Sequence, residues 1–139
     1  MNGFERFDFF PPAHPEEKLI NEEIKIIKMK KHRLVIMESP FNGDRKENLK
    51  NINYARRCMR DCLLKEEYPF ASHLLYTQEG ILNDNIQEER NLGIEAGLCW
   101  GRLAEATIVY TDFGITDGMK KGIKRAEKEG RKVEYRRLE

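Results

Sequence analysis

This sequence of 139 residues has no long hydrophobic run, no cysteine framework and no excess of one charge. No stretch approaches the roughly 18 consecutive apolar residues of a membrane-spanning helix. Met1–Pro15 carries acidic groups and the pair Pro11-Pro12 where a secretory signal would need an apolar core. We therefore expect no membrane partner and a location in the cytoplasm.

Cysteine occurs three times, an odd number at spacings that suit no metal site. Cys58 and Cys62 are one helical turn apart, which predicts that both face a hydrophobic core. A reduced protein without a metal or another cofactor is the economical interpretation of this pattern.

Basic and acidic residues nearly cancel, with 25 Lys and Arg against 24 Asp and Glu. Binding to nucleic acid depends on a basic surface that neutralises phosphates, so the composition argues against that partner. The charge is nevertheless uneven. Residues 120–139 hold nine basic and four acidic side chains, and residues 34–119 carry a net charge of −5. The basic C-terminal segment could face a small anion, an acidic surface of a neighbouring subunit or only solvent.

Hydrophobic residues make up 40% of the chain, which is enough for one domain with its own core. We predict an N-terminal arm and helix over residues 1–32 and an α/β domain over residues 33–139. Met1–Pro15 combines phenylalanines with prolines, so this arm is expected to pack on the domain or on a partner subunit. Glu16–Lys31 favours a helix, although Ile24 and Ile26 also permit a short strand.

From Arg33 onward, short apolar runs alternate with helical periodicity. Leu34–Met37 is typical of a strand buried on both faces of a parallel sheet. The other expected strands are Tyr68–Ser72, Ala106–Tyr110 and Lys132–Arg136; the expected helices are Glu47–Glu66, Gln87–Glu105 with Leu92, Ala96, Cys99 and Leu103 on its apolar face, and a last helix between a cap at Thr116 or Asp117 and a stop at Gly130. The pattern predicts an open, mostly parallel α/β sheet of four to five strands flanked by helices.

Open parallel sheets bind ligands beyond the carboxyl ends of their strands, here Glu38–Asp44, His73–Asn85 and Thr111–Gly118. The first loop lacks the spaced glycines of a dinucleotide site and the Gly-Lys-Ser/Thr of a phosphate loop. It offers polar side chains and the aromatic face of Phe41. Gly118 lies at an expected helix N-terminus, which suits a phosphate or carboxylate. Each loop on its own is equally consistent with a structural turn.

Taken in order, four segments resemble the nucleoside 2-deoxyribosyltransferase-like proteins, and most closely a small branch found in phages and bacteria. They are Glu38-Ser39-Pro40-Phe41-Asn42-Gly43-Asp44, His73-Leu74-Leu75-Tyr76 with Asn83-Asp84-Asn85, Glu88-Glu89-Arg90-Asn91-Leu92-Gly93-Ile94, and Thr116-Asp117-Gly118-Met119. The resemblance covers residues 33–136. It implies a flavodoxin-like (Rossmann-like) parallel sheet and cleavage of an N-glycosidic bond, in which a glutamate attacks the anomeric carbon and an aspartate assists proton transfer.

The resemblance also implies the residues of the site. The expected ligand contacts are Ser39, Pro40, Phe41, Asn42, Gly43, Asp44, His73, Glu88, Arg90, Phe113, Gly114, Thr116, Gly118 and Met119. The family's nucleophilic glutamate falls on Gly122, which has no side chain to react. Glu38 departs from the family as well, since the first strand there tends to end in a small residue. Glu38, Asp84 and Asp117 are the candidate catalytic carboxylates, with Asp84 in the role of the family's aspartate.

Three functions follow as hypotheses. The first is a catalytically degenerate protein that binds a nucleoside or nucleotide, such as a phage protein that sequesters a nucleotide signal in the host cytoplasm. The second is an active N-glycosidase or 2-deoxyribosyltransferase with a relocated carboxylate. The third is a protein-interaction module, suggested by the apolar arm and the basic end. The resemblance implies a homo-oligomer, a dimer or larger.

Overall fold

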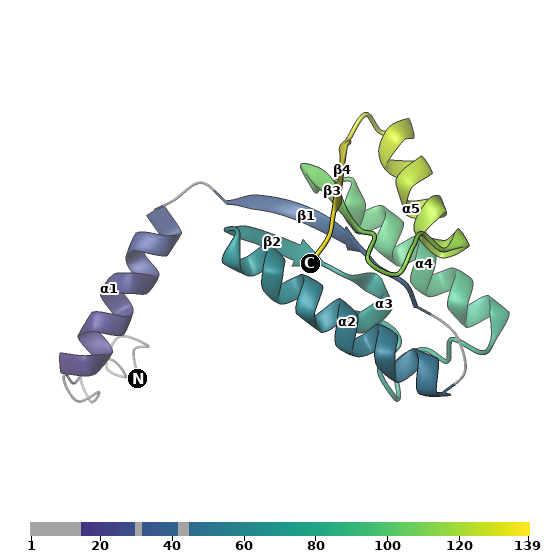
Figure 1. Cartoon of the computed structure of the whole chain (residues 1–139), viewed down its shortest axis with the longest axis horizontal. Coiled ribbons are helices and arrows are strands. Elements are labelled where there is room, and N and C mark those ends of the chain that lie inside the picture. Colours follow the sequence, from purple (N-terminus) through teal and green to yellow (C-terminus); the bar gives the residue numbers. More distant parts are fainter. Residues whose placement is uncertain (1–14, 30–31, 42–44) are drawn as a thin grey trace, which may run out of the picture. The chain divides into compact units, whose positions relative to one another are not determined.

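The computed structural model describes residues 15–29, 32–41 and 45–139, in two compact units (Figure 1). The first unit, residues 1–31, contains helix α1 (Pro15–Met29). Pro15 at the first helical position and the acidic Glu16 and Glu17 in the first turn favour a helix start here. The helix predicted over Glu16–Lys31 is thus confirmed over most of its length, whereas the predicted irregular arm lies, apart from Pro15, outside the described residues.

The second unit, residues 32–139, is an α/β fold. Its elements are β1 (Arg33–Glu38), α2 (Arg45–Leu64), β2 (Glu67–Phe70), α3 (Ser72–Leu75), α4 (Gln87–Gly101), β3 (Ala106–Tyr110), α5 (Asp117–Lys128) and β4 (Lys132–Arg136). The four strands are all parallel, in the order β2-β1-β3-β4. This confirms the predicted fold class. Within the described residues, no helix is both long and apolar enough to cross a membrane.

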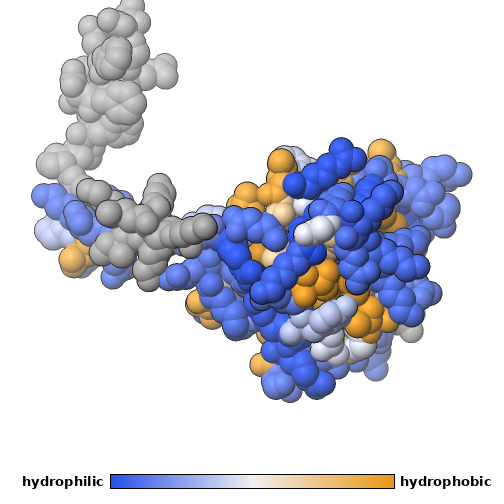
Figure 2. Space-filling model, turned by 90° about the horizontal axis from the view of Figure 1, so that it is seen from above, coloured by the Kyte–Doolittle hydropathy of each residue, from blue (hydrophilic) through white to orange (hydrophobic). Residues whose placement is uncertain are grey.

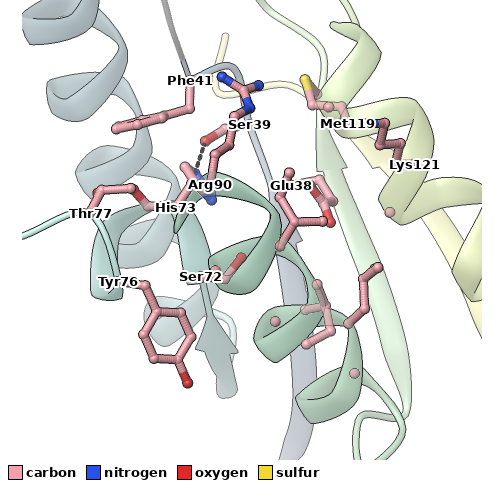
Figure 3. Close-up of a pocket in the computed structure, with 18 of the residues that line it drawn as sticks. Glu38, Ser39, Phe41, Ser72, His73, Tyr76, Thr77, Arg90, Met119 and Lys121 are labelled. Carbon is pink, nitrogen blue, oxygen red and sulfur yellow. Dashed lines mark hydrogen bonds between the residues drawn. The ribbon is translucent and has the colours of Figure 1, made fainter. Parts of the chain in front are cut away.

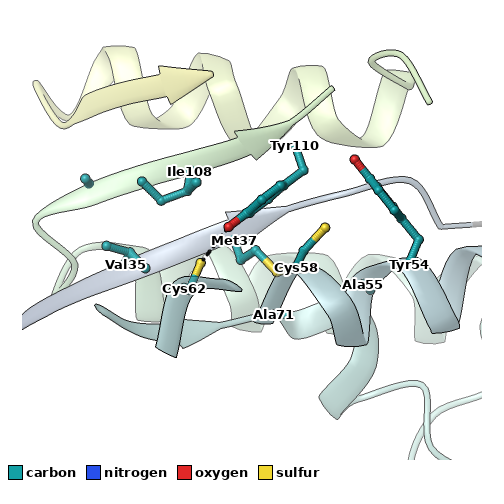
Figure 4. Close-up of a cluster of buried hydrophobic side chains, with 10 residues drawn as sticks. Val35, Met37, Tyr54, Ala55, Cys58, Cys62, Ala71, Ile108 and Tyr110 are labelled. Carbon is teal, nitrogen blue, oxygen red and sulfur yellow. Dashed lines mark hydrogen bonds between the residues drawn. The ribbon is translucent and has the colours of Figure 1, made fainter. Parts of the chain in front are cut away.

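Alternation along the strands divides the buried side chains between two faces of the sheet. On one face Val35 and Met37 of β1 pack with Ile108 and Tyr110 of β3 against helix α2 (Figure 4). Cys58 and Cys62 of α2 are fully buried in this cluster, as their spacing predicted. On the other face Val109 packs with Met119 and Ile123 of α5. The sheet therefore lies between helices, and β1 presents Ile36 and Glu38 to the side opposite α2.

The predicted apolar face of the second long helix is wrong. Leu92 of α4 is 61% exposed and Leu103, which lies just after the end of α4, is 66% exposed, whereas Gly97 and Gly101 are buried instead. A Cβ added at Gly97 would lie 2.5 Å from the Cβ of Ser72, so glycine allows α4 to approach α3 closely. This close packing overrides the hydrophobic periodicity and exposes apolar residues on the outer side of the helix.

The face of the α/β unit seen in Figure 2 is mostly hydrophilic, with apolar areas between the charged groups. A partly buried ion-pair network ties strands of the sheet together. Glu67, at the start of β2, accepts hydrogen bonds from Arg136 of β4 at 2.7 and 3.1 Å and from Arg33 of β1. Arg33 also donates to Glu134 at 2.7 Å. Burial alone would raise the pKa of Glu67, but the hydrogen bonds from Arg136 and Arg33 outweigh it and hold the pKa below its ordinary value.

Replacing Glu67 with Gln is expected to lower the free energy of unfolding by about 3 kcal/mol at pH 7, because it leaves two arginines without their buried counter-charge. A depressed carboxylate pKa stabilises the fold above the unfolded-state pKa and ceases to do so as the pH falls through the folded-state value. The deficit of Glu67→Gln should therefore shrink below about pH 4. Urea unfolding at pH 7 and pH 3 measures it, with the exposed Glu127→Gln as the matched control.

Candidate functional site

A cavity of about 110 Å³ opens where β1 and β2 end, between α3, α4 and the first turns of α5. Figure 3 shows Phe41, His73 and Thr77 on one side of it, Met119 and Lys121 of α5 on the other, and Glu38 between them. The cavity thus lies beyond the carboxyl ends of parallel strands, where such sheets bind ligands. Its volume is of the order that accommodates one small ring, since a cavity of roughly 150 Å³ holds benzene.

Glu38, the last residue of β1, places its carboxyl group inside this cavity. Among the described residues no hydrogen-bonding partner satisfies the carboxyl group. Burial raises its pKa to about 8, and the opposing effect of the Arg131 guanidinium is smaller. Glu38 is consequently a mostly neutral acid at pH 7, able to donate a hydrogen bond and, once ionised, to act as a base or nucleophile.

Gly122 of α5 lies directly against this carboxyl group. A Cβ built on Gly122 would stand 2.6 Å from Cδ of Glu38 and closer still to Oε1. Any side chain at position 122 would therefore compete with Glu38 for the same space. The Glu38 carboxyl group thus occupies the space directly in front of the α5 backbone at Gly122.

Ser39 and His73 form a hydrogen-bonded pair that lines the same cavity as Glu38. Oγ of Ser39 lies 2.8 Å from Nε2 of His73, and the ring of Phe41 meets the His73 ring edge-on at 5.8 Å between centroids. Burial lowers the pKa of His73 to about 4, so its imidazole is neutral at pH 7. A neutral imidazole with so low a pKa is a weak base. The pair is suited to orienting a hydroxyl group toward a ligand.

The outer part of the site is acidic and amide-rich. Asp84 and Glu89 line the cavity, and Arg90 approaches Asp84 at 3.5 Å. A second, more open hollow of about 530 Å³ shares Phe41, Asp84 and Glu89 with the first. The two hollows together give a ligand room for a small inner ring and a larger outer group.

At the opposite wall, α5 begins against the cavity. Thr116 caps this helix, its Oγ1 accepting a hydrogen bond of 3.3 Å from the Met119 amide. This confirms one of the two predicted caps, and Gly130, with φ +70°, follows the helix end as expected. Thr116, Gly118, Met119 and Lys121 all line the cavity. The positive end of the helix and the Lys121 side chain make this wall the more cationic one.

The structure brings together many of the residues that the sequence nominated: Glu38, Ser39, Phe41, His73, Asp84, Arg90, Thr116, Gly118 and Met119 line the cavity. Pro40 is buried but is absent from the lining. Asn42, Gly43 and Asp44 lie outside the described residues. The functional roles given to all of these residues stay predictions.

Four nominated residues lie away from the cavity. Asp117 has a 98% exposed side chain that faces Lys120 at 3.7 Å, because it follows the cap on the outer side of α5. Phe113 packs on Tyr54 of α2, with ring centroids 4.3 Å apart, and Gly114 forms a turn at φ +82°. Glu88 of α4 does not line the cavity, whereas its neighbour Glu89 does.

Gly122, which the sequence had singled out, also lines the cavity. Sequence reasoning missed other lining residues: Ile36, Phe70, Ser72, Tyr76, Thr77, Leu82, Glu89, Gly93, Ile94, Gly97, Leu98, Gly101, Lys121 and Arg131. The signal that could have found the α4 wall is the spacing of Gly93, Gly97 and Gly101, which repeats every fourth residue on one face of a helix. Arg131 carried no such signal. It reaches the site from the loop before β4 and is held by Thr107, Gly101 and Glu129. Within the residues that the structure describes, no cluster of three metal-ligating side chains occurs.

Comparison with known proteins agrees with this architecture. The family described as Domain of unknown function (DUF7768) matches residues 33–136. A solved structure of a 2-deoxyribosyltransferase from the psychrotolerant bacterium Bacillus psychrosaccharolyticus aligns with a TM-score of 0.51 and 19% sequence identity, over 75% of this chain and 72% of that chain. At this identity the similarity shows a shared fold. No curated protein matches the sequence.

The raised pKa of Glu38 predicts a specific dependence of stability on pH. An acid with a raised folded-state pKa stabilises the fold fully below its unfolded-state pKa, near 4.5, and this contribution is lost as the pH rises to about 8. Glu38→Gln cannot ionise, so its stability relative to the natural chain should increase across this range by up to about 1.4 kcal/mol for each pH unit. Urea unfolding at pH 5 and pH 8 measures the difference; an equal pH dependence in both proteins would contradict the assignment.

Proposed function

The chain belongs to the DUF7768 family, and we propose that its cavity binds a nucleoside or nucleotide and breaks the N-glycosidic bond. The fold shared with a 2-deoxyribosyltransferase supports the class of ligand. The shape of the site supports it further, because an inner cavity of about 110 Å³ continues into a wider outer hollow. A sugar ring suits the inner part and a base the outer part, where Phe41 offers an aromatic face.

The observation that carries the proposal is the position of Glu38. The resemblance expects a nucleophilic glutamate on residue 122, and Gly122 alone would leave the site without one. The Glu38 carboxyl group fills the space in front of Gly122, so a carboxyl group faces the cavity after all. This favours an active enzyme with a relocated carboxylate over the catalytically degenerate binding protein.

The proposed chemistry needs Glu38 in its ionised form. One carboxylate oxygen bonds to the anomeric carbon while the C–N bond breaks and its electron pair leaves with the base. The departing base takes up a proton, for which Asp84 at the outer side of the cavity is the candidate donor. Water or a second base then attacks the anomeric carbon, passes a proton back to Asp84 and releases the Glu38 carboxylate.

A nucleotide signal held without chemistry, as in a phage protein acting in the host cytoplasm, would use the same cavity and is the alternative. An interaction module would not need the cavity. Homo-oligomer formation is part of the proposal, supported by Leu92, Trp100 and Leu103, which are more than half exposed along and just after α4. Large apolar side chains at a surface of this kind mark interfaces in many proteins.

Binding is tested by thermal unfolding with deoxynucleosides and their 5′-monophosphates. A ligand at a hundred times its dissociation constant adds roughly 2.7 kcal/mol to the free energy of unfolding, which raises the melting temperature by several degrees. Phe41→Ala should remove most of the shift, since it deletes the stacking face of the base. The absence of a shift with every compound would favour the interaction module.

Catalysis is tested by chromatography of free base released from the same compounds. Because Glu38 must be ionised, the rate is expected to rise with pH, to reach half of its maximum near pH 8 and to level off above that pH. Glu38→Gln should lower it by at least about a thousand-fold, as loss of a nucleophile does, whereas the exposed Glu127→Gln should match the natural chain. Binding without release of base would support sequestration instead.

A further inference from the structure

Gly122 is exceptional within α5. The helix is capped by Thr116 and buries an apolar face of Met119, Ile123 and Ala126, so its sequence is otherwise well suited to a helix. Glycine in a helix interior is the least favourable residue after proline. Gly118, one turn earlier, would carry a Cβ 3.9 Å from Oγ1 of Thr116, an ordinary contact. Position 122 is different because a Cβ there would stand 2.6 Å from Cδ of Glu38.

Glu38, for its part, is fixed at its backbone. It pairs with Val109 of the central strand β3, and the neighbouring Met37 is buried on the opposite face of the sheet. The side chain of Glu38 must therefore enter the layer between the sheet and α5. The buried backbone of α5 at Gly122 bounds this space. The positive charge of Arg131 acts on the Glu38 carboxyl group and lowers its pKa in part.

We infer that Glu38 and Gly122 are an exchangeable pair: the cavity has room for one carboxyl group at this place, which β1 supplies here and which α5 can supply when residue 38 is small. Gly122 is then a positioning residue that sets where the carboxyl group lies. The inference deepens the proposed function, since the ligand would meet the same group from either element. The packing part of it holds without any ligand.

The packing part is tested by a double-mutant cycle on the unliganded protein. In the natural chain Gly122→Ala should lower the melting temperature by a few degrees, because the methyl group displaces the Glu38 carboxyl. In a Glu38→Ala background the same change should raise the melting temperature, since alanine favours the helix and the space is vacant. Gly118→Ala should have the same effect in both backgrounds. An equal effect of Gly122→Ala in both backgrounds would overturn the inference.

The exchange itself is tested with Glu38→Ala/Gly122→Glu. NMR titration of the carboxyl carbons should show one glutamate with a pKa well above the ordinary range, as in the natural chain and unlike Glu38→Ala alone. The exchanged variant should also regain the release of base that Glu38→Ala loses. If it folds with an ordinary glutamate pKa, or unfolds while both Gly122→Ala variants fold, the carboxyl group is not exchangeable and the inference is wrong.

The proposed function and the exchange between Glu38 and Gly122 can be disproved independently of each other. If neither the natural chain nor any variant binds or cleaves a nucleoside, the proposed function is wrong, while a coupled double-mutant cycle and a restored raised pKa would still establish the pair. If the natural chain cleaves nucleosides but the cycle is additive, the proposed function stands and the exchange is wrong.

Discussion

The buried carboxyl group of Glu38 constrains this site more than any other single group. A carboxyl group largely withdrawn from solvent favours its neutral form, and the opposing influence of Arg131 is smaller than the effect of burial. Its pKa is raised as a result. In this conformation it occupies the space that a Cβ at Gly122 of α5 would need, so a side chain there would have to displace it. The charge of the inner cavity and the space in front of Gly122 both depend on this one placement.

The fold supplies the placement through ordinary sheet geometry. Parallel pairing on both sides of β1 fixes which side chains face α2 and which face α4 and α5. Val35 and Met37 enter the core with Cys58 and Cys62, and the alternation then delivers Glu38 to the other side at the strand end. The neighbouring Ser39 already belongs to the loop and reaches His73. A rigid strand thus carries the acidic group, and a flanking pair of polar residues is held beside it.

Much of this fold could be predicted from the sequence because its signals are local. The strands Ala106–Tyr110 and Lys132–Arg136 were predicted with the bounds that the structure has, since β-branched residues and turn residues mark them. The short helix α3 and the buried face of α4 could not be predicted. Both depend on contact between segments, such as Ser72 against Gly97, that periodicity does not encode. Glu38 and Gly122 each stood out as departures from a family pattern, but only the three-dimensional packing brings the Glu38 carboxyl group against the backbone of Gly122.

The most direct test of whether Glu38 meets a ligand is the NMR chemical shift of its own carboxyl carbon. With glutamate labelled at the carboxyl carbon and Glu38→Gln used for assignment, a deoxynucleoside is added at pH 7 and the chemical shift of Glu38 is followed. If Glu38 meets the ligand, this resonance moves with added ligand, by ionisation or by formation of an ester, while the Glu127 resonance stays in place. A Glu38 resonance that is unchanged at saturating ligand would contradict the account.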